Sequence, residues 1–308
     1  MDRPTLRAVA AGLALGLLLL LSVAAVAASE DGLVERVESK YNTILIYKRG
    51  SYLSLTFGYN DRLYTESTAN TEDPLELPVT YTRFMSAALL YVSEQQDILE
   101  IGFGGGSTAA YLHRHMPEAT ITSVELDDKV VELAERYFGV KAEPGLDIVN
   151  RDGRLFLMTD GRQFDAILVD AYRGPFVPFH LMTVEFYELT RQHLKPGGVL
   201  VQNVEPSTML FPASIATLLA VFDSVEFYVA GGNVVTVAYD GPQRTEVELR
   251  VQGEALQEKY GFRYPLPELL KARRFLAELP QEEPLTDDFA PVEALRAIER
   301  HNEKWVEP

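Results

Sequence analysis

The sequence predicts an α/β protein built on a doubly wound, mostly parallel sheet, and three observations carry this prediction. An apolar strand-like segment runs into the glycine-rich turn Gly102–Gly106. Strand-like and helix-like segments then alternate over residues 97–239, as in a parallel sheet covered on both faces. The last two strand-like segments are separated only by Gly231 and Gly232, which predicts a terminal antiparallel hairpin on that sheet.

The individual elements follow from the spacing of apolar residues and from turn residues between them. The expected strands of the sheet are 97–102, 119–125, 146–149, 164–170, 198–204, 224–230 and 233–239. The expected helices are 107–116, 127–138, 152–158, 182–194 and 211–222. A terminal hairpin departs from the plain dinucleotide-binding fold and is typical of class I S-adenosylmethionine-dependent methyltransferase-like (Rossmann-like) folds.

The segments on either side of the sheet differ in character. Residues 29–80 are expected to form a small antiparallel β meander, with strands at 42–48, 52–57 and 62–66 and a polar connection over 68–78. Apolar residues at helical spacing predict a helix over 80–92. We therefore expect a nucleoside-binding domain at 81–242 and a helical, acidic C-terminal extension at 243–308.

The N-terminal residues 1–28 have the pattern of a targeting segment. Arg3 and Arg7 precede an apolar run from Ala8 to Leu21, and small residues follow up to Ala28. This pattern predicts a secretory signal peptide, or an uncleaved signal anchor whose single transmembrane helix would hold the protein to a membrane. Both alternatives predict a membrane-anchored or exported protein, with the rest of the chain outside the cytoplasm.

Composition narrows the classes of partner. The chain carries a net charge of −17, and because residues 1–28 contribute +1, the remainder carries −18. Such a body repels phosphate, so we expect no nucleic-acid partner. This negative charge favours cationic substrates such as polyamines. The alternative is that it only keeps the protein soluble. The chain has no cysteine, and its five histidines are scattered, so we expect no metal site.

The glycine-rich turn and the acid that follows it predict a nucleoside site. Gly102, Gly104 and Gly106 let the backbone approach a ligand closely, and the next helix begins with free N–H groups. Glu125 comes nineteen residues after Gly106, at the end of the second strand, where a carboxylate suits the ribose hydroxyls. The alternative is a tight turn that only connects a strand to a helix.

Three further acidic positions follow strands. Asp127 and Asp128, just after Glu125, are expected to cap the next helix. Asp152, followed by Gly153, comes after the third strand and has two alternative roles. It accepts a hydrogen bond from the adenine amine, or it caps the helix that begins at Gly153.

The fourth strand ends in Asp170, which lies where parallel strands deliver their ligands. Partial burial there raises the pKa of a carboxyl toward that of a useful general base, so we predict Asp170 as the catalytic base. The alternative is an acid that closes a turn. Tyr172 packs on the nucleoside or the substrate, or it fills the loop.

These residues together resemble the spermidine synthase (polyamine aminopropyltransferase) family, in its membrane-linked, spermidine-synthase-like branch. The segments that carry the resemblance are Glu100–Gly106, Val124-Glu125, Asp152-Gly153, Phe164–Asp170, Phe186-Tyr187, Leu194–Gly198 and, in the tail, Leu285–Glu293. The resemblance implies that the glycine turn holds decarboxylated S-adenosylmethionine, Glu125 its ribose and Asp152 its adenine. It implies that Asp170 takes a proton from the attacking amine, and that the protein is a homodimer.

Two positions depart from that family. Its loop after the fourth strand has a second acid that helps bind the diamine, and Arg173 stands there in this chain. Its Tyr-His-Glu before the glycine-rich strand is here Tyr81-Thr82-Arg83, so Tyr81 is kept as a candidate substrate residue.

Three hypotheses follow for the function. The first is aminopropyl transfer from decarboxylated S-adenosylmethionine to an amine such as putrescine. The second is methyl transfer from intact S-adenosylmethionine on the same fold. The third is a non-catalytic, exported module that binds polyamine or nucleoside.

Overall fold

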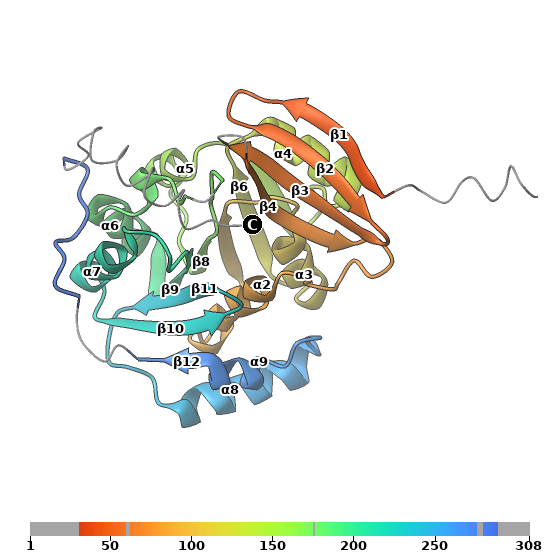
Figure 1. The fold of residues 1–308 in the computed structure, drawn as a ribbon. Coiled ribbons are helices and arrows are strands. Elements are labelled where there is room, and N and C mark those ends of the chain that lie inside the picture. The colour runs from red at the N-terminus through yellow and green to blue at the C-terminus, as the bar shows by residue number, and fades with distance from the viewer. Residues whose placement is uncertain (1–30, 60–61, 175, 276–279, 289–308) are drawn as a thin grey trace, which may run out of the picture.

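A computed structural model of the chain describes residues 31–59, 62–174, 176–275 and 280–288 (Figure 1). Two sheets lie within these residues. One is a four-stranded antiparallel meander near the N-terminus, and the other is an eight-stranded mixed sheet flanked by helices. The predicted doubly wound α/β fold with a preceding β meander is therefore confirmed.

The meander has its strands in chain order, and each strand pairs antiparallel with the next. Its strands are β1 (Gly32–Glu38), β2 (Thr43–Arg49), β3 (Tyr52–Tyr59) and β4 (Arg62–Asn70). One face of it packs on helix α4 (Asp128–Leu133), where Ile44, Ile46 and Leu55 meet Val130 and Leu133. The meander thus lies against the second helix of the main sheet, as Figure 1 shows, and the apolar side chains of this cluster join the two.

The sequence missed β1 and placed the end of β4 too early. β1 is an exposed edge strand with charged residues at Glu35, Arg36 and Glu38, so it lacks the apolar run that marks a strand. The residues that extend β4 from the expected end at 66 to Asn70 are Ser, Thr, Ala and Asn. Pairing with β3, which no local pattern reveals, holds these residues in the sheet.

The main sheet has the strand order β12-β10-β11-β9-β8-β5-β6-β7. Its strands are β5 (Asp97–Ile101), β6 (Thr120–Glu125), β7 (Leu146–Asn150), β8 (Phe164–Val169), β9 (Leu194–Val204), β10 (Ser224–Ala230), β11 (Asn233–Tyr239) and β12 (Arg273–Arg274). The strands β9, β8, β5, β6 and β7 run parallel to one another. Strands β10 and β11 form the predicted antiparallel hairpin, and β11 pairs antiparallel with β9. Chain order reverses beside β5, between β6 and β8, which is the switch point where ligands bind in such sheets.

Alternating residues of each central strand supply the two faces of the sheet. On β8, Ala166 and Leu168 pack on one side, and Ile167 and Val169 on the other. The second side is covered by α5 (Gly153–Thr159), α6 (Val184–Gln192) and α7 (Phe211–Val221). The first side is covered by α3 (Ser107–His115), by α2 (Thr80–Met85) with the 3₁₀ turn η2 (Ser86–Leu90), and by the C-terminal helices.

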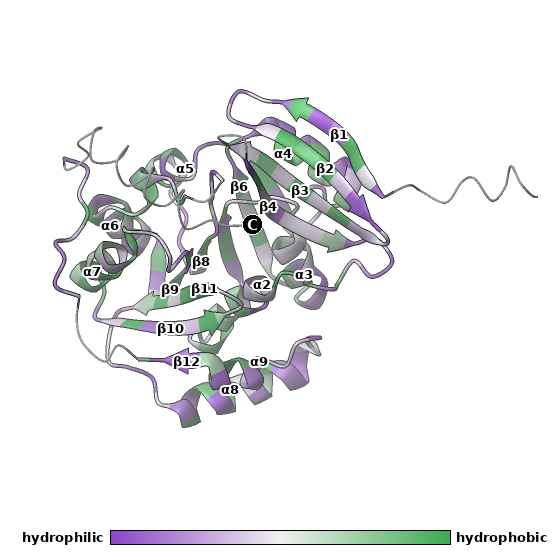
Figure 2. Cartoon of the chain, in the orientation of Figure 1, coloured by the Kyte–Doolittle hydropathy of each residue, from purple (hydrophilic) through white to green (hydrophobic). Residues whose placement is uncertain are grey.

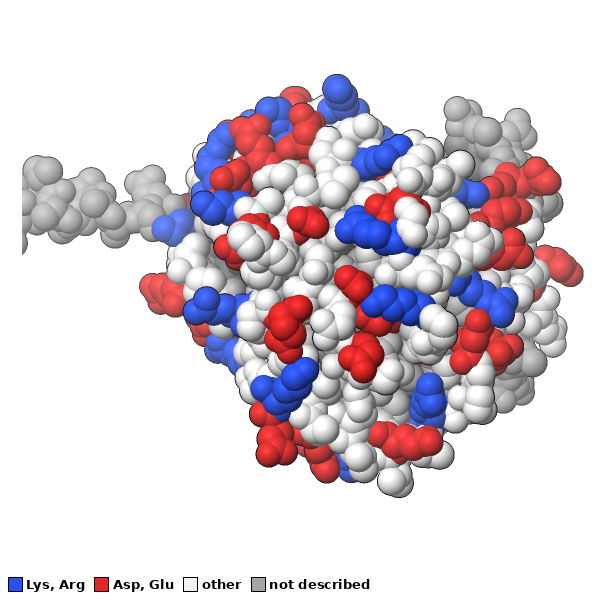
Figure 3. All heavy atoms as spheres, turned by 180° about the vertical axis from the view of Figure 1, so that it is seen from behind, with Lys and Arg blue, Asp and Glu red and all other residues white. Residues whose placement is uncertain are grey.

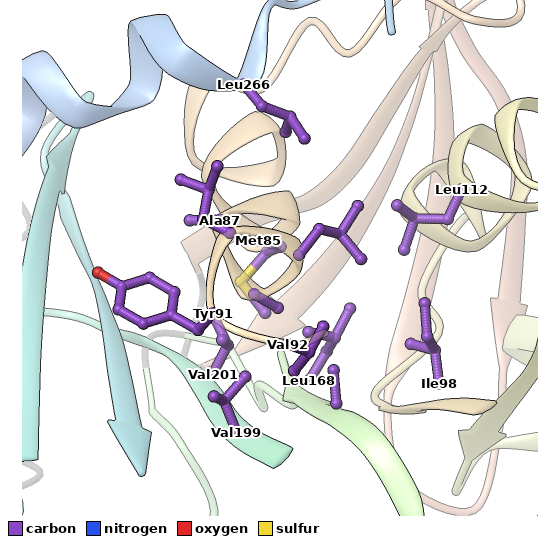
Figure 4. Packing of buried hydrophobic residues seen from close by; sticks show 14 of the residues in the cluster. Met85, Ala87, Tyr91, Val92, Ile98, Leu112, Leu168, Val199, Val201 and Leu266 are labelled. Atoms are coloured by element: carbon purple, nitrogen blue, oxygen red, sulfur yellow. The ribbon is translucent and has the colours of Figure 1, made fainter. Parts of the chain in front are cut away.

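The segment from 80 to 92, expected to be one helix, divides into α2 and η2. The Ser86 hydroxyl donates to the Arg83 carbonyl, and 3₁₀ geometry at a helix end tightens the chain. Figure 4 shows the consequence, since Met85, Ala87 and Tyr91 lie between Val199 and Val201 of the sheet and Leu266 of the next layer. This buried segment leads directly into β5.

The predicted helix 127–138 also changes geometry. It begins as α4 and ends in one π-helical turn, η3 (Ala134–Phe138), which stops at Gly139 with φ 71°. The remaining short 3₁₀ segments are η4 (Phe179–Leu181) and η5 (Leu270–Ala272).

The C-terminal region begins with α8 (Glu246–Tyr260), which Thr245 and Glu248 start with a capping box. Hydrophilic residues dominate this outer helix in Figure 2. The short helix α9 (Leu266–Leu269) and η5 follow, and β12 then adds a strand to β10. A strand was not expected here, because two arginines carry no strand pattern.

The prediction of a membrane-anchored or exported protein needs correction. Within the residues that the structure describes, no helix has both the length and the apolar character needed to cross a bilayer. Residues 1–28, on which that prediction was based, lie outside the described residues, as do residues 289–308 of the predicted C-terminal extension.

Candidate active site

A cavity of about 570 Å³ lies between the carboxyl ends of β5, β6 and β8 and the N-terminal meander. Its volume is in the range of small-molecule sites. Eight of the nine predicted site residues line it: Tyr81, Gly102, Gly104, Glu125, Asp152, Gly153, Asp170 and Tyr172. The ninth, Gly106, is not part of the wall.

The glycine-rich turn is shaped by close contacts with its surroundings. Gly102 has φ 96°, and a Cβ there would lie 2.2 Å from the Asp170 carbonyl oxygen. Its N–H donates to Val124 O at 2.9 Å, so the turn is pinned between the neighbouring strands. Gly106 has φ 73° and caps α3 from behind the wall, where a Cβ would be 2.5 Å from the Phe103 ring. Gly106 therefore shapes the turn without facing the cavity.

Glu125 ties this turn to the end of β6. Its Oε2 accepts the N–H groups of Phe103 at 3.0 Å and Gly104 at 3.3 Å, and its Oε1 accepts the N–H of Asp127 at 3.0 Å. Burial raises the pKa of this carboxyl, and the backbone donors oppose that shift. The acid is thus held in one orientation, with lone pairs left for a ligand.

The cap alternatives are confirmed for two acids. Asp127 accepts the N–H of Lys129 at 3.1 Å as the N-cap of α4. Asp152 accepts the N–H of Leu155 at 2.9 Å as the N-cap of α5, while it also faces the cavity. Its predicted contact with adenine stays a prediction.

His180, on η4, is a cavity residue that sequence reasoning missed. Its Nε2 lies 3.0 Å from Asp152 Oδ2, and this contact holds the pKa of Asp152 below its usual value. The two residues are 28 positions apart and meet only through the loop after β8. No local pattern marks this histidine.

Asp170 directly follows β8. Its Oδ1 accepts the side-chain amide of Asn203 at 2.9 Å, and its N–H donates to Ile101 O at 2.8 Å. Burial raises the pKa of this carboxyl to about 6, while Asn203 and the Tyr81 hydroxyl act in the opposite direction. Asp170 is therefore an acid whose protonation changes close to neutral pH, which suits a general base.

Two tyrosines lie on the wall around Asp170. Tyr81, at the start of α2, has its pKa raised by burial and by the charge of Asp170. Tyr172 donates from its hydroxyl to Asn203 O at 3.1 Å, so this loop residue is anchored on β9. Its ring is part of the wall, although the sequence alone left its role open.

The two arginines that depart from the expected pattern lie in different places. Arg173 is exposed on the cavity wall, and its N–H closes a turn with Phe176 O at 2.8 Å. Arg83 is directed away, donating to Leu77 O at 2.8 Å and packing 4.3 Å from the centre of the Tyr264 ring. Its charge is used in that contact and not in the cavity.

Two more acids line the cavity. Glu100 on β5 accepts the Ser123 hydroxyl at 2.6 Å, and burial raises its pKa to about 8. Glu66 comes from β4 of the meander. Acidic and basic side chains are interspersed over the molecular surface seen in Figure 3. The cavity wall, by contrast, carries several carboxyl groups close together.

Residues 80–239 match the model of the spermine/spermidine synthase domain. The polyamine aminopropyltransferase of Vibrio vulnificus is 31% identical over 239 residues, covering 74% of this chain and 78% of that protein. The chain belongs to the spermine/spermidine synthase family. Polyamine aminopropyltransferases are transferases. The prediction that this protein is a transferase of that kind is therefore confirmed.

Solved structures agree on the fold of this family member. A probable spermidine synthase from Corynebacterium glutamicum superposes with a TM-score of 0.65 at 20% identity, covering 83% of this chain and 97% of that one. A spermidine synthase in complex with the transition-state analogue AdoDATO superposes with a TM-score of 0.62 at 18% identity, covering 80% and 85%.

Proposed function

We propose that this protein transfers an aminopropyl group from decarboxylated S-adenosylmethionine to an amine such as putrescine, with Asp170 as the base. The observation that carries the assignment is the acid-lined cavity at the switch point of the sheet, with Asp170 at its centre. Family membership supports the reaction class, and the geometry supports the individual residue roles.

We assign the donor nucleoside to the side of the cavity formed by β5, β6 and α5. Glu125 is held at the tip of β6, where its free lone pairs suit ribose hydroxyls. Asp152 stays ionised beside His180 and suits the exocyclic amine of adenine. Gly102 and Gly104 allow the ligand to lie against the backbone.

The charge of the cavity supports the decarboxylated donor over intact S-adenosylmethionine. The intact molecule carries a carboxylate that would enter a space lined by Asp170, which is ionised at neutral pH, and by the buried acids Glu66 and Glu100. Like charges in a partly desolvated site repel strongly. The decarboxylated donor presents only cationic groups to the same acids.

The reaction requires that the amine be aligned with the propyl carbon and that the amine lose a proton. The amine nitrogen attacks the propyl carbon next to sulfur, the C–N bond forms, and the C–S electron pair leaves with the neutral thioether. An alkylammonium has a pKa of about 10.4, so it must lose a proton before it attacks. Asp170, with its pKa of about 6, is ionised at neutral pH and accepts that proton.

Calorimetric titration of the full chain with three ligands tests this proposal. We expect the decarboxylated donor to bind more tightly than intact S-adenosylmethionine, and putrescine to be converted in its presence with release of methylthioadenosine. Tighter binding of the intact donor would point instead to methyl transfer. Failure to bind either donor or methylthioadenosine would contradict a nucleoside site altogether.

A further inference from the structure

Glu66 is a buried carboxyl group with no counter-charge. Its Oε1 is inaccessible to solvent and has no hydrogen-bond partner among the residues that the structure describes. The side chain lies on the cavity wall and accepts a hydrogen bond from the N–H of Gly174. No ion pair joins it to a lysine, arginine or histidine of the described chain.

The neighbours of Glu66 make its ionised form energetically unfavourable. Asp170 and Glu125 face it from the main sheet, and their charges together with burial raise the pKa of Glu66 well above its usual value. An unpaired buried carboxylate costs free energy, and a buried acceptor without a donor adds to that cost. A cation with several N–H donors would remove both penalties.

We propose that Glu66 binds a primary ammonium group on a short alkyl chain, carried by one of the two substrates. Three donors on such a nitrogen satisfy Glu66 Oε1 and leave N–H groups for the other acids of the wall. Two sources offer this chemistry, namely the aminopropyl end of the donor and the distal, non-reacting amine of a diamine acceptor. The inference rests on the proposed function and assigns to the meander a part in choosing the substrate.

The position of Arg173 agrees with this assignment. The loop after β8 presents an exposed guanidinium at the cavity wall instead of a second acid, so a cation is not attracted to that loop. Glu66 supplies a carboxylate from β4 of the meander. Tyr64 of the same strand lies beside Gly174, the residue whose N–H Glu66 accepts, and its buried hydroxyl has no partner in the described chain.

The variant E66Q, which keeps size and removes charge, tests the proposal, with E72Q as a matched control. Glu72 is an exposed carboxylate shortly after the same strand. Three quantities are measured: the Kd of the decarboxylated donor, the Kd of methylthioadenosine, which lacks the ammonium, and the KM of putrescine against that of a monoamine of equal length. Thermal unfolding confirms that both variants fold.

If the donor carries the ammonium, E66Q weakens the donor about tenfold to a hundredfold and leaves methylthioadenosine unchanged, as expected for a lost hydrogen bond to a charged group. If the acceptor carries it, E66Q raises the KM of putrescine by a similar factor and leaves the monoamine unchanged. Equal behaviour of E66Q and E72Q in every measurement would overturn the inference. A wild-type protein that binds no donor would instead contradict the proposed function.

Discussion

The side-chain amide of Asn203 donates a 2.9 Å hydrogen bond to Oδ1 of Asp170. The orientation of this amide is set by Asn233, whose Nδ2 donates to Asn203 Oδ1 at 3.0 Å. Asn203 is buried on β9 and Asn233 begins β11, so two adjacent strands hold the carboxylate in place. The protonation and direction of Asp170 therefore depend on the antiparallel end of the sheet.

Replacing Asp170 with Asn tests the base. The variant keeps the side-chain volume but cannot accept a proton, so we expect kcat to fall about 10²- to 10⁴-fold. Binding of methylthioadenosine, which carries no cationic tail, should change little in calorimetry, because the residues assigned to the nucleoside are untouched. Full activity in this variant would falsify the role of Asp170.

Replacing Asn203 with Leu tests how the pKa of Asp170 is set. Activity requires the ionised carboxylate, so in the wild type it is expected to fall as the pH drops through about 6. The Asn203 amide stabilises the ionised form, and its loss raises the pKa of Asp170 further. The acid limb of the kcat profile should therefore move to higher pH. An unmoved limb with reduced kcat would mean that Asn203 only supports the local structure.

Replacing Gly102 with Ala, compared with the same change at Gly139, separates backbone strain from steric conflict. Both residues have positive φ, but a Cβ at Gly139 meets nothing within 4 Å, whereas at Gly102 it lies 2.2 Å from Asp170 O. We expect G139A to cost about 1–2 kcal/mol in the free energy of unfolding. G102A should cost more and also lower kcat, since the Asp170 backbone must move. Equal losses in chemical denaturation would argue against the close approach.

The buried pair Arg273–Glu226 predicts how firmly the C-terminal strand is attached. Both side chains are almost fully buried, and Tyr91 also donates to Glu226 at 2.6 Å. Replacing Glu226 with Gln leaves a buried guanidinium without its counter-charge. We expect a loss of about 3–5 kcal/mol in the free energy of unfolding, measured by denaturant titration. A change below 1 kcal/mol would mean that β12 contributes little to the fold.

Much of the site was predictable because it lies at strand ends. Glu125 and Asp170 each follow an apolar strand directly, and the parallel sheet brings those ends together. Gly106 has the same local signal as Gly102, but the turn carries it behind the wall. A glycine motif alone does not say which glycines face the ligand.

The residues that the sequence did not reveal reach the cavity by tertiary contact. Glu66 comes from an antiparallel strand, and its position depends on how the meander packs on α4. His180 depends on a loop that folds back over Asp152. Neither the packing of the meander on α4 nor the folding of this loop leaves a periodic pattern in the sequence. β12 was missed for a similar reason, because two residues are too few to show strand alternation.

The tail segment that contributed to the family resemblance makes a contact whose effect on the donor site is testable. Asp287 forms an ion pair with Arg154, and Nη1 of Arg154 lies 2.7 Å from Asp287 Oδ1. The same guanidinium donates to His180 O at 3.2 Å, and the His180 ring pairs with Asp152. Leu285 extends the contact by accepting the N–H of Val184 at 2.8 Å. The tail thus holds the loop that carries His180 against α5.

Replacing Asp287 with Asn should loosen this loop and weaken the donor without changing the chemical step. The pair is partly exposed, so its contribution is about 1 kcal/mol, which corresponds to roughly a fivefold increase in the donor Kd. The kcat at saturating donor should stay the same, because Asp170 is not involved. Asp288 is exposed beside it, and D288N serves as the matched control. If D287N and D288N bind the donor equally well, the tail does not position the His180 loop. A fall in kcat alone would place its influence on the acceptor side of the cavity instead.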